Sequence, residues 1–236
     1  MDSGYGRLMA ASGTFRHPFI PDLPGQEQFQ GRALHSLEYQ RPEAFVGQRV
    51  VVVGAANSAV QIAVELSGTA RVSLAARTLV KFTPQRPFGR DVHDWITWAR
   101  VDQLKLGHLS RLPSPRNVLD PGVYRAAFLQ GQVDQRPLFE RFTRQGVVWP
   151  GGQQEAVDAV VFATGYRPNL RFLFGTGALG TRGEPVQRLG VSLTVPGLYY
   201  VGLSGQRAVA SATLRGAGPD AEVVTQHLAR AFSQRG

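Results

Sequence analysis

Four consecutive valines at residues 50–53, followed at once by Gly54, limit the fold of this chain more than any other feature. A continuous β-branched run is typical of a strand that is buried on both faces of a parallel sheet. Apolar residues then recur at helical spacing over residues 58–67, and a second short apolar run follows at residues 72–75. Strand, turn, helix and strand within about 30 residues make a βαβ unit. We therefore predict an α/β fold with a Rossmann-like parallel sheet flanked by helices.

The turn after the valine run has the small residues that a dinucleotide-binding turn needs. In such a turn the three small positions allow a sharp bend, close approach of the backbone to a pyrophosphate, and close packing of the helix on the strand. Here they hold Gly54, Ala56 and Ala59, and Asn57 and Ser58 add side-chain donors where the helix begins. We predict that four of these residues bind the pyrophosphate of a nicotinamide cofactor: Gly54, Ala56, Asn57 and Ser58. The alternative is a structural βα turn that holds no nucleotide.

Arg77 follows the second predicted strand, where a dinucleotide fold places the residue that contacts the ribose. An acidic residue at this place favours NAD, whereas the planar donor fork of an arginine suits a 2′-phosphate. Lys81 is close enough in sequence to assist. We therefore predict NADP(H) as the nicotinamide nucleotide that this chain binds.

Composition narrows the classes of protein that remain. The chain has 236 residues, no cysteine and a net charge of +9. The absence of cysteine excludes a disulfide framework, a thiolate zinc site and a redox-active dithiol within it. No apolar run approaches the roughly 20 residues of a membrane helix, and residues 1–16 do not have the pattern of a signal peptide, so we expect a cytoplasmic protein without a membrane contact. The arginines are scattered and form no stripe, which argues against a role in nucleic-acid binding.

Several motifs occur in an order that resembles one enzyme family. The pattern F-x-G-x-x-x-H-x-x-x-Y from Phe29 to Tyr39 resembles the fingerprint of the class B flavoprotein monooxygenases, which include the flavin-containing monooxygenases. Residues 157–166, which end in Ala-Thr-Gly-Tyr, resemble a strand of that family, and residues 11–13 look like an altered earlier copy of the same linker. Residues 197–202 are similar to its final strand beside the flavin. The ordered series covers nearly the whole chain.

This resemblance implies an oxidoreductase that uses FAD and NADPH. NADPH would deliver hydride to the flavin, which would then activate oxygen to attack a soft nucleophile such as nitrogen or sulfur. The resemblance places Thr164, Gly165 and Tyr166 at the interface between the two cofactors and assigns no catalytic side chain. His35 is expected to be a hydrogen-bonded structural residue, and on a helix it would share a face with Tyr39.

The chain also departs from the family pattern. The family begins with an FAD-binding βαβ unit that carries its own glycine fingerprint, but only eleven residues precede Ser12. We therefore expect a truncated or partner-dependent form, with the FAD domain completed by another chain or by self-association into a homo-oligomer. The expected domains are a partial FAD segment and linker at residues 1–45, an NAD(P)-binding domain at 46–165 and an FAD-domain-like segment at 166–236.

Two other functions remain open. The chain could be a non-catalytic NADP(H)-binding module, or one subunit of a split flavoenzyme. The pyridine nucleotide disulfide reductases share the two-nucleotide architecture, but those of the thioredoxin reductase type carry a cysteine pair in the NADPH domain, and this chain has none.

Overall fold

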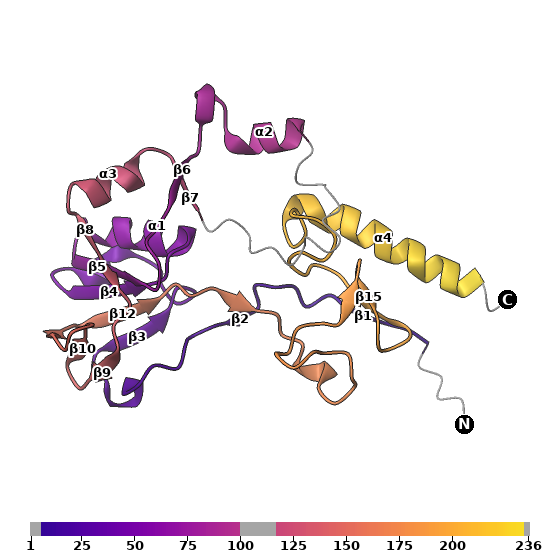
Figure 1. Cartoon of the computed structure of the whole chain (residues 1–236), viewed down its shortest axis with the longest axis horizontal. Helices are drawn as coiled ribbons and strands as arrows, with labels where there is room; N and C mark the ends of the chain where they lie inside the picture. Colours follow the sequence, from indigo (N-terminus) through magenta and orange to yellow (C-terminus); the bar gives the residue numbers. More distant parts are fainter. Residues whose placement is uncertain (1–5, 100–116, 234–236) are drawn as a thin grey trace. The chain divides into compact units, whose positions relative to one another are not determined.

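The computed structural model describes residues 6–99 and 117–233, which divide into two compact units (Figure 1). The central unit consists of Pro18–Val92 and Pro115–Gly165, and the terminal unit of Met1–His17, His93–Ser114 and Tyr166–Gly236. The expected domain ranges 1–45, 46–165 and 166–236 stay a prediction. Residues 1–5, 100–116 and 234–236 of those ranges lie outside the described residues.

A five-stranded parallel sheet forms the middle of the central unit, in the order β3-β12-β4-β5-β8. Its strands are β3 (Arg32–His35), β4 (Arg49–Val53), β5 (Arg71–Ala76), β8 (Val133–Pro137) and β12 (Ala159–Phe162). Helices α1 (Asn57–Leu66) and α3 (Val123–Leu129) lie on the same side of it (Figure 1). The predicted Rossmann-like α/β fold is therefore confirmed.

The valine run of β4 is buried on both faces of this sheet. Val50 and Val52 pack with the apolar side of α1, whereas Val51 and Val53 pack with a second cluster that includes Phe142. All four valines are at most 3% exposed. Because neighbouring strand residues point to opposite faces, a strand with both faces covered needs an unbroken apolar run, which this sequence supplies.

The second face is covered by an antiparallel sheet with the order β11-β10-β9, not by a helix. Its strands are β9 (Arg141–Thr143), β10 (Gly146–Val148) and β11 (Gln154–Ala156). A further pair, β6 (Phe82–Pro84) and β7 (Val118–Asp120), runs parallel. Short 3-10 helices occupy Gln26–Gln28, Pro42–Phe45 and Pro87–Gly89.

The terminal unit contains a four-stranded sheet in the order β1-β16-β15-β14 and a long helix. Its elements are β1 (Leu8–Ala10), β14 (Gln187–Arg188), β15 (Val191–Ser192), β16 (Leu198–Tyr200), the 3-10 helix Arg171–Leu173 and α4 (Leu214–Ser233). Helix α2 (Val92–Trp98) begins at Val92, the last residue of the central unit's first segment, Pro18–Val92. Strand β2 (His17–Pro18) pairs with β13 (Tyr166–Arg167). Within residues 6–99 and 117–233, no helix combines the length and apolar character of a membrane crossing.

A buried ion pair joins α4 to the loop that precedes it. Arg207 Nε donates to Asp220 Oδ1 at 2.8 Å, and the two side chains are 7% and 0% exposed. The hydroxyl of Ser211 accepts from the amides of Arg207 and Ala208, both at 3.1 Å. A buried pair with both partners present avoids the cost of an isolated buried charge, so it fixes this loop on the helix.

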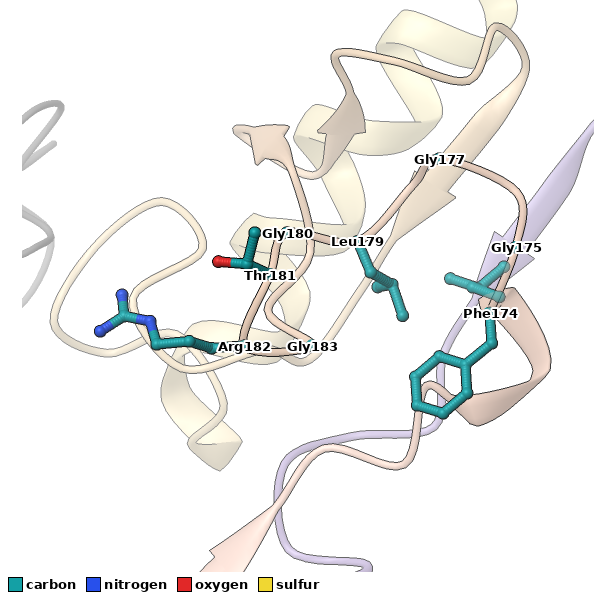
Figure 2. Close-up of a pocket in the computed structure, with 9 residues that line it drawn as sticks. Phe174, Gly175, Gly177, Leu179, Gly180, Thr181, Arg182 and Gly183 are labelled. Carbon is teal, nitrogen blue, oxygen red and sulfur yellow. The ribbon is translucent and has the colours of Figure 1, made fainter.

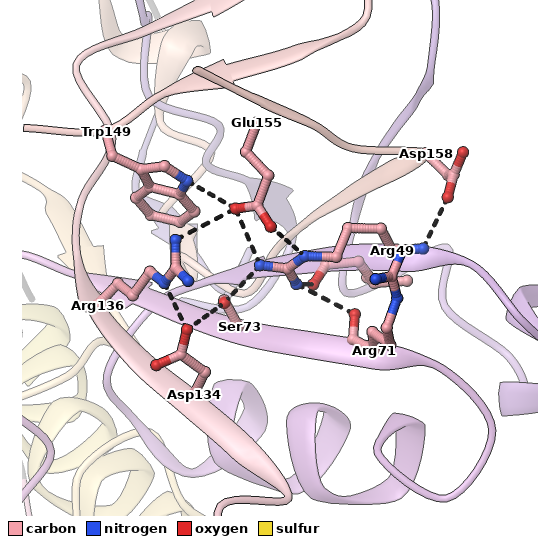
Figure 3. Close-up of polar contacts among 9 residues, drawn as sticks. Arg49, Arg71, Ser73, Asp134, Arg136, Trp149, Glu155 and Asp158 are labelled. Carbon is pink, nitrogen blue, oxygen red and sulfur yellow. Dashed lines mark hydrogen bonds and ion pairs between the residues drawn. The ribbon is translucent and has the colours of Figure 1, made fainter. Parts of the chain in front are cut away.

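A second polar network holds the antiparallel sheet to the amino end of the parallel sheet (Figure 3). Arg49, at the start of β4, donates from Nε to Glu155 Oε1 at 2.8 Å and from Nη2 to Ser73 Oγ at 2.7 Å. Its Nη1 donates to the carbonyl of Arg71 at 3.1 Å. The indole of Trp149 donates to Glu155 Oε2 at 2.7 Å. Strands β4, β5 and β11 are thus linked through one guanidinium group.

The charge of Glu155 is stabilised within this network. Burial alone would raise the pKa of the Glu155 carboxyl, but hydrogen bonds from Arg49 and Trp149 and the charges of Arg49 and Arg136 outweigh burial and lower it. Arg136 Nη1 lies 3.2 Å from Glu155 Oε2. Glu155 therefore binds its proton less readily in the folded protein than in the unfolded chain.

Replacing this carboxylate should destabilise the fold in a pH-dependent way. Glu155→Gln should lower the free energy of unfolding by about 2 kcal/mol at neutral pH, because Arg49 loses its charged partner while it stays buried. A carboxyl with a lowered folded-state pKa contributes above its unfolded pKa of about 4.3 and loses that contribution as the pH falls through the folded-state value. Urea denaturation at a series of pH values should therefore show the difference from wild type shrinking below about pH 4.

The matched control is Glu184→Gln, which removes a carboxylate from an exposed pair with Arg182 at 3.7 Å. This substitution should leave the urea midpoint unchanged, because solvent screens an exposed pair. Equal effects of the two substitutions, or an effect of Glu155→Gln that is the same at all pH values, would contradict the assigned role of the Arg49 network.

Candidate functional site

The predicted nucleotide turn lies at the carboxyl end of β4, between the ends of β5 and β12. The amide of Gly54 donates to the carbonyl of Ala75 at 3.0 Å, and its φ is 145°. A Cβ added at Gly54 would lie 2.5 Å from the carbonyl oxygen of Ala163 and 3.0 Å from Cβ of Ala59. No side chain fits at this position, and Ala59, fully buried, is the small residue that lets α1 lie close to the strand.

The first turn of α1 presents backbone donors without a side-chain cap. Ala56 is the N-cap residue and makes no side-chain hydrogen bond to the helix, and the first turn contains no acidic residue. Asn57 and Ser58 are exposed beside it. Oδ1 of Asn57 accepts from the amide of Leu119 at 3.1 Å, so this oxygen holds β7 in place and the amide nitrogen of the side chain is left as a donor. The helix start is therefore suited to an anion.

The predicted phosphate-binding cations lie beyond the same edge of the sheet. Arg77 directly follows β5, and Lys81 directly precedes β6; both are exposed. Within the described part of the chain, neither side chain makes an ion pair. Both cations are thus left to interact with a ligand or with solvent.

The Ala-Thr-Gly-Tyr segment is tied to the backbone of its own neighbourhood. The hydroxyl of Thr164 donates to the carbonyl of Phe19, and the carbonyl of Gly165 accepts from the amide of Phe19 at 2.9 Å. That same carbonyl is 3.0 Å from Nε2 of His35. The ring of Tyr166 meets Phe15 edge to face at 6.0 Å. These contacts fix the path of the chain after β12.

His35 has the structural role that was expected. The suggestion that His35 and Tyr39 lie on one helix is wrong. His35 ends strand β3 and is followed by a turn, so it shares no helical face with Tyr39. It is 1% exposed, and Nδ1 accepts from the amide of Leu37 at 3.1 Å. The side chain of Tyr39 turns instead to Glu65, with 2.9 Å between the hydroxyl and Oε2. Burial, together with this hydrogen bond, raises the pKa of Tyr39.

Two pockets belong to the terminal unit. One, of about 430 Å³, lies beside Ser12, Gly13, Gly202 and Thr213, and Oγ of Ser12 is buried there without a hydrogen-bond partner among the described residues. The other, of about 440 Å³, is formed by the glycine-rich loop from Leu173 to Gly183 (Figure 2). Figure 2 shows the side chain of Arg182 extending away from Leu179 and Phe174. Only the first pocket contains an unsatisfied buried polar atom.

A third pocket, of about 270 Å³, lies in the central unit where β6 and β7 meet the start of α3. Its cationic residues, Arg86 and Arg125, were missed in the sequence analysis. They lie 39 positions apart in a chain rich in arginine, and no local motif marks them. Only the parallel pairing of β6 with β7 brings the two segments together.

Comparisons with known proteins agree on one family. The model of a family described as flavin-binding monooxygenase-like matches residues 3–83. An indole-3-pyruvate monooxygenase, YUCCA8 of Oryza sativa, is 32% identical over 250 residues, which cover 91% of this chain and 58% of that protein. A putative dimethylaniline monooxygenase (N-oxide-forming) of Homo sapiens is 32% identical over 204 residues, covering 72% of this chain and 37% of that protein.

The fold has solved counterparts as well. The structure of a mutant flavin monooxygenase from Stenotrophomonas maltophilia matches with a TM-score of 0.77 and 29% identity, covering 95% of this chain and 63% of that one. This chain therefore spans less than two thirds of the length of these relatives.

The close approach at Gly54 leads to a testable expectation. Gly54→Ala should lower the free energy of unfolding by about 2 kcal/mol or more, because a methyl group would meet the Ala163 carbonyl in a backbone region that L-residues avoid. Gly151→Ala is the matched control, because Gly151 also has a positive φ, 89°, but nothing lies within 4 Å of its added Cβ. Thermal denaturation should show a clearly larger loss for Gly54→Ala, and equal losses would mean that the turn has room for a side chain.

Proposed function

The chain belongs to the class B flavoprotein monooxygenase family, and from that membership we propose that its central unit binds NADPH for an FAD-dependent monooxygenase. The observation that carries the proposal is the turn at Gly54. It combines a position too crowded for a side chain with an uncapped helix start at the carboxyl end of a buried parallel strand. Ligands of open α/β sheets bind at this edge, where backbone donors and the helix dipole favour a phosphate.

The residues present fit a pyrophosphate. Ala56 leaves the amides of the first turn without a side-chain cap, and the first turn has no carboxylate to repel an anion. In the proposal, Gly54 and Ala56 let the phosphates approach the backbone, while Asn57 and Ser58 donate side-chain hydrogen bonds. Arg77 binds the 2′-phosphate with help from Lys81, because both are exposed cations in the short segment between β5 and β6.

We propose that one pocket of the terminal unit holds part of the flavin. The orphan hydroxyl of Ser12 marks a place for a hydrogen-bonding ligand, since buried polar groups almost always have partners. The proposal keeps Thr164, Gly165 and Tyr166 as cofactor contacts and names no catalytic side chain. We also propose that a partner chain or a second copy of this chain completes the flavin site.

The chemistry that the cofactors supply in such an enzyme is hydride transfer from NADPH to FAD and oxygenation of a soft nucleophile. The described residues bind and orient the nucleotide. Gly54, Ala56, Asn57 and Ser58 hold its centre, and Arg77 selects its phosphorylated ribose. A non-catalytic NADP(H)-binding module or a subunit of a split flavoenzyme remains the alternative, favoured by the fact that all of these contacts belong to one unit with its own core.

Nucleotide titration tests the binding role. NADPH should bind the wild-type chain more tightly than NADH, and Arg77→Ala should weaken NADPH binding about tenfold while leaving NADH nearly unchanged. Nicotinamide fluorescence measures both affinities. Arg144→Ala is the control, because it removes an exposed arginine whose side chain makes no ion pair among the described residues. An Arg77→Ala variant that weakens both nucleotides equally would contradict recognition of the 2′-phosphate.

Absorbance between about 300 and 500 nm, with and without added FAD, separates the enzyme from the binding module. A flavin spectrum on the purified chain, accompanied by a larger mass in light scattering, supports a monooxygenase whose flavin site is completed by association. NADPH binding without flavin would favour the binding module or the split flavoenzyme. Failure of the wild-type chain to bind NADPH would overturn the proposal.

A further inference from the structure

The loop at residues 203–213, which precedes α4, forms one wall of the 430 Å³ pocket in the terminal unit. Gly202 lines this pocket just before the loop, Ala212 and Thr213 line it at the end of the loop, and Leu214 lines it at the start of α4. Between these points the loop turns inward, and its buried residues are Leu203, Gln206, Arg207, Ala208, Ala210 and Ser211. The loop therefore connects the interior of the terminal unit to the wall of the pocket.

Ala212 in this wall has a strained backbone. Its φ is 66°, in the left-handed region that residues with a Cβ seldom adopt. Such a conformation persists only where the surrounding structure holds it, and it occurs often at ligand sites. The amide of Thr213 donates to the carbonyl of Ala210 at 3.0 Å, and the hydroxyl of Thr213 donates to the same carbonyl at 2.6 Å. The strained residue is thus held between two residues that are bonded to each other.

Helix α4 approaches the loop so closely that the loop has no room to relax. A Cβ added at Gly216 would overlap the carbonyl oxygen of Ala210. The amides of Gly216 and Ala217 both donate to the carbonyl of Thr213, at 3.1 and 3.0 Å. Because the backbone of the loop meets the backbone of the helix directly, the position of the pocket wall depends on how the loop is fixed to α4.

The buried pair of Arg207 and Asp220 fixes it, but the pair is not fully hydrogen-bonded. Arg207 Nε donates to Asp220 Oδ1 at 2.8 Å, whereas Arg207 Nη2 and Asp220 Oδ2 are buried without a partner among the described residues. The neighbouring Nε2 of Gln206 is in the same condition. Unpaired buried polar atoms destabilise a fold, and apolar residues of similar volume often stabilise it at least as well as a buried ion pair does. Stability alone therefore explains this pair poorly.

We propose that Arg207, Ser211 and Asp220 are positioning residues for the pocket, which they do not line themselves. Asp220 anchors the guanidinium group of Arg207, and the hydroxyl of Ser211 accepts from the amides of Arg207 and Ala208. Together they hold Ala212 in its strained conformation before a ligand arrives. A wall that is ordered in advance lowers the entropy that binding costs. The inference rests on the flavin pocket of the proposed function and deepens it.

Ala212→Gly tests the role of the strain. Glycine adopts the left-handed conformation freely, so the melting temperature of this variant should equal or exceed that of the wild type. The wall becomes mobile, however, so FAD should bind about fivefold more weakly in a titration followed by flavin fluorescence. Leu189→Gly is the matched control, because Leu189 has a φ of 54° in the same unit and does not line the pocket. It should leave the affinity for FAD unchanged.

The double variant Arg207→Met/Asp220→Leu separates positioning from stability. It removes both buried charges together, so its melting temperature should stay close to that of the wild type. Apolar contacts have no preferred direction, so the loop is held less exactly and FAD should bind about tenfold more weakly. Ser211→Ala should weaken FAD binding about threefold, because two buried amides lose their acceptor.

The relation between FAD affinity and melting temperature decides the outcome. An affinity that falls only in proportion to the melting temperature across these variants would overturn the inference, since the residues would then act through stability alone. Wild-type affinity in both Ala212→Gly and the double variant would overturn it while the flavin pocket stands. If the double variant does not fold, Ala212→Gly decides alone, because that substitution relieves strain. A wild-type chain that binds no FAD would overturn the flavin pocket itself, and the inference with it.

Discussion

The central unit depends on the way three parallel strands end together at Gly54. The amide of Gly54 donates to the end of β5 at Ala75, and the carbonyl of Val53 accepts from the amide of Ala163 beyond β12. The position left between them has no space for a Cβ. One glycine therefore lets β4 turn into α1 without separating the strands, and the same turn exposes the amides that begin the helix. In the proposed function, this single residue meets both the packing requirement of the sheet and the requirement of a phosphate for close approach to the backbone.

The sequence predicted the parts of the fold in which local pattern and final environment agree. The valines of β4 form an unbroken apolar run, and the structure buries them alternately on the two faces of the sheet. Strand β3 was not predicted, because Arg32 and Ala33 are exposed and only Leu34 and His35 are buried, so its four residues show no strand alternation. Its existence depends on pairing with β12, more than 120 positions away. A pattern within the segment could not indicate such a contact.

The candidate site likewise contains residues that a local sequence pattern indicates and residues that it does not. The structure places Gly54, Ala56, Asn57 and Ser58 at the turn after β4 and Arg77 directly after β5, as their spacing from the strands indicated, and their binding role stays a prediction. Arg86, Arg125 and the hydroxyl of Ser12 were not identifiable, because their significance comes from pockets that the folded chain assembles. The Arg49 network was also invisible, since 106 positions separate Arg49 from Glu155. In a chain with this much arginine, residue type alone cannot distinguish arginines that stabilise the fold from arginines that are available to bind a ligand.

In the structure, the two kinds of arginine differ in their burial and in whether a carboxylate pairs with them. Arg49 and Arg207 are buried and face carboxylates, so their charges are neutralised within the protein. Arg77, Arg86 and Arg125 are exposed without such partners among the described residues, and all three belong to segments at the carboxyl edge of the sheet or beside it. Arg49 lies at the opposite, amino edge of the same sheet, at the start of β4. Arg77, Arg86 and Arg125 therefore leave positive charge uncancelled near the edge where the phosphates of a dinucleotide would lie in the proposed function.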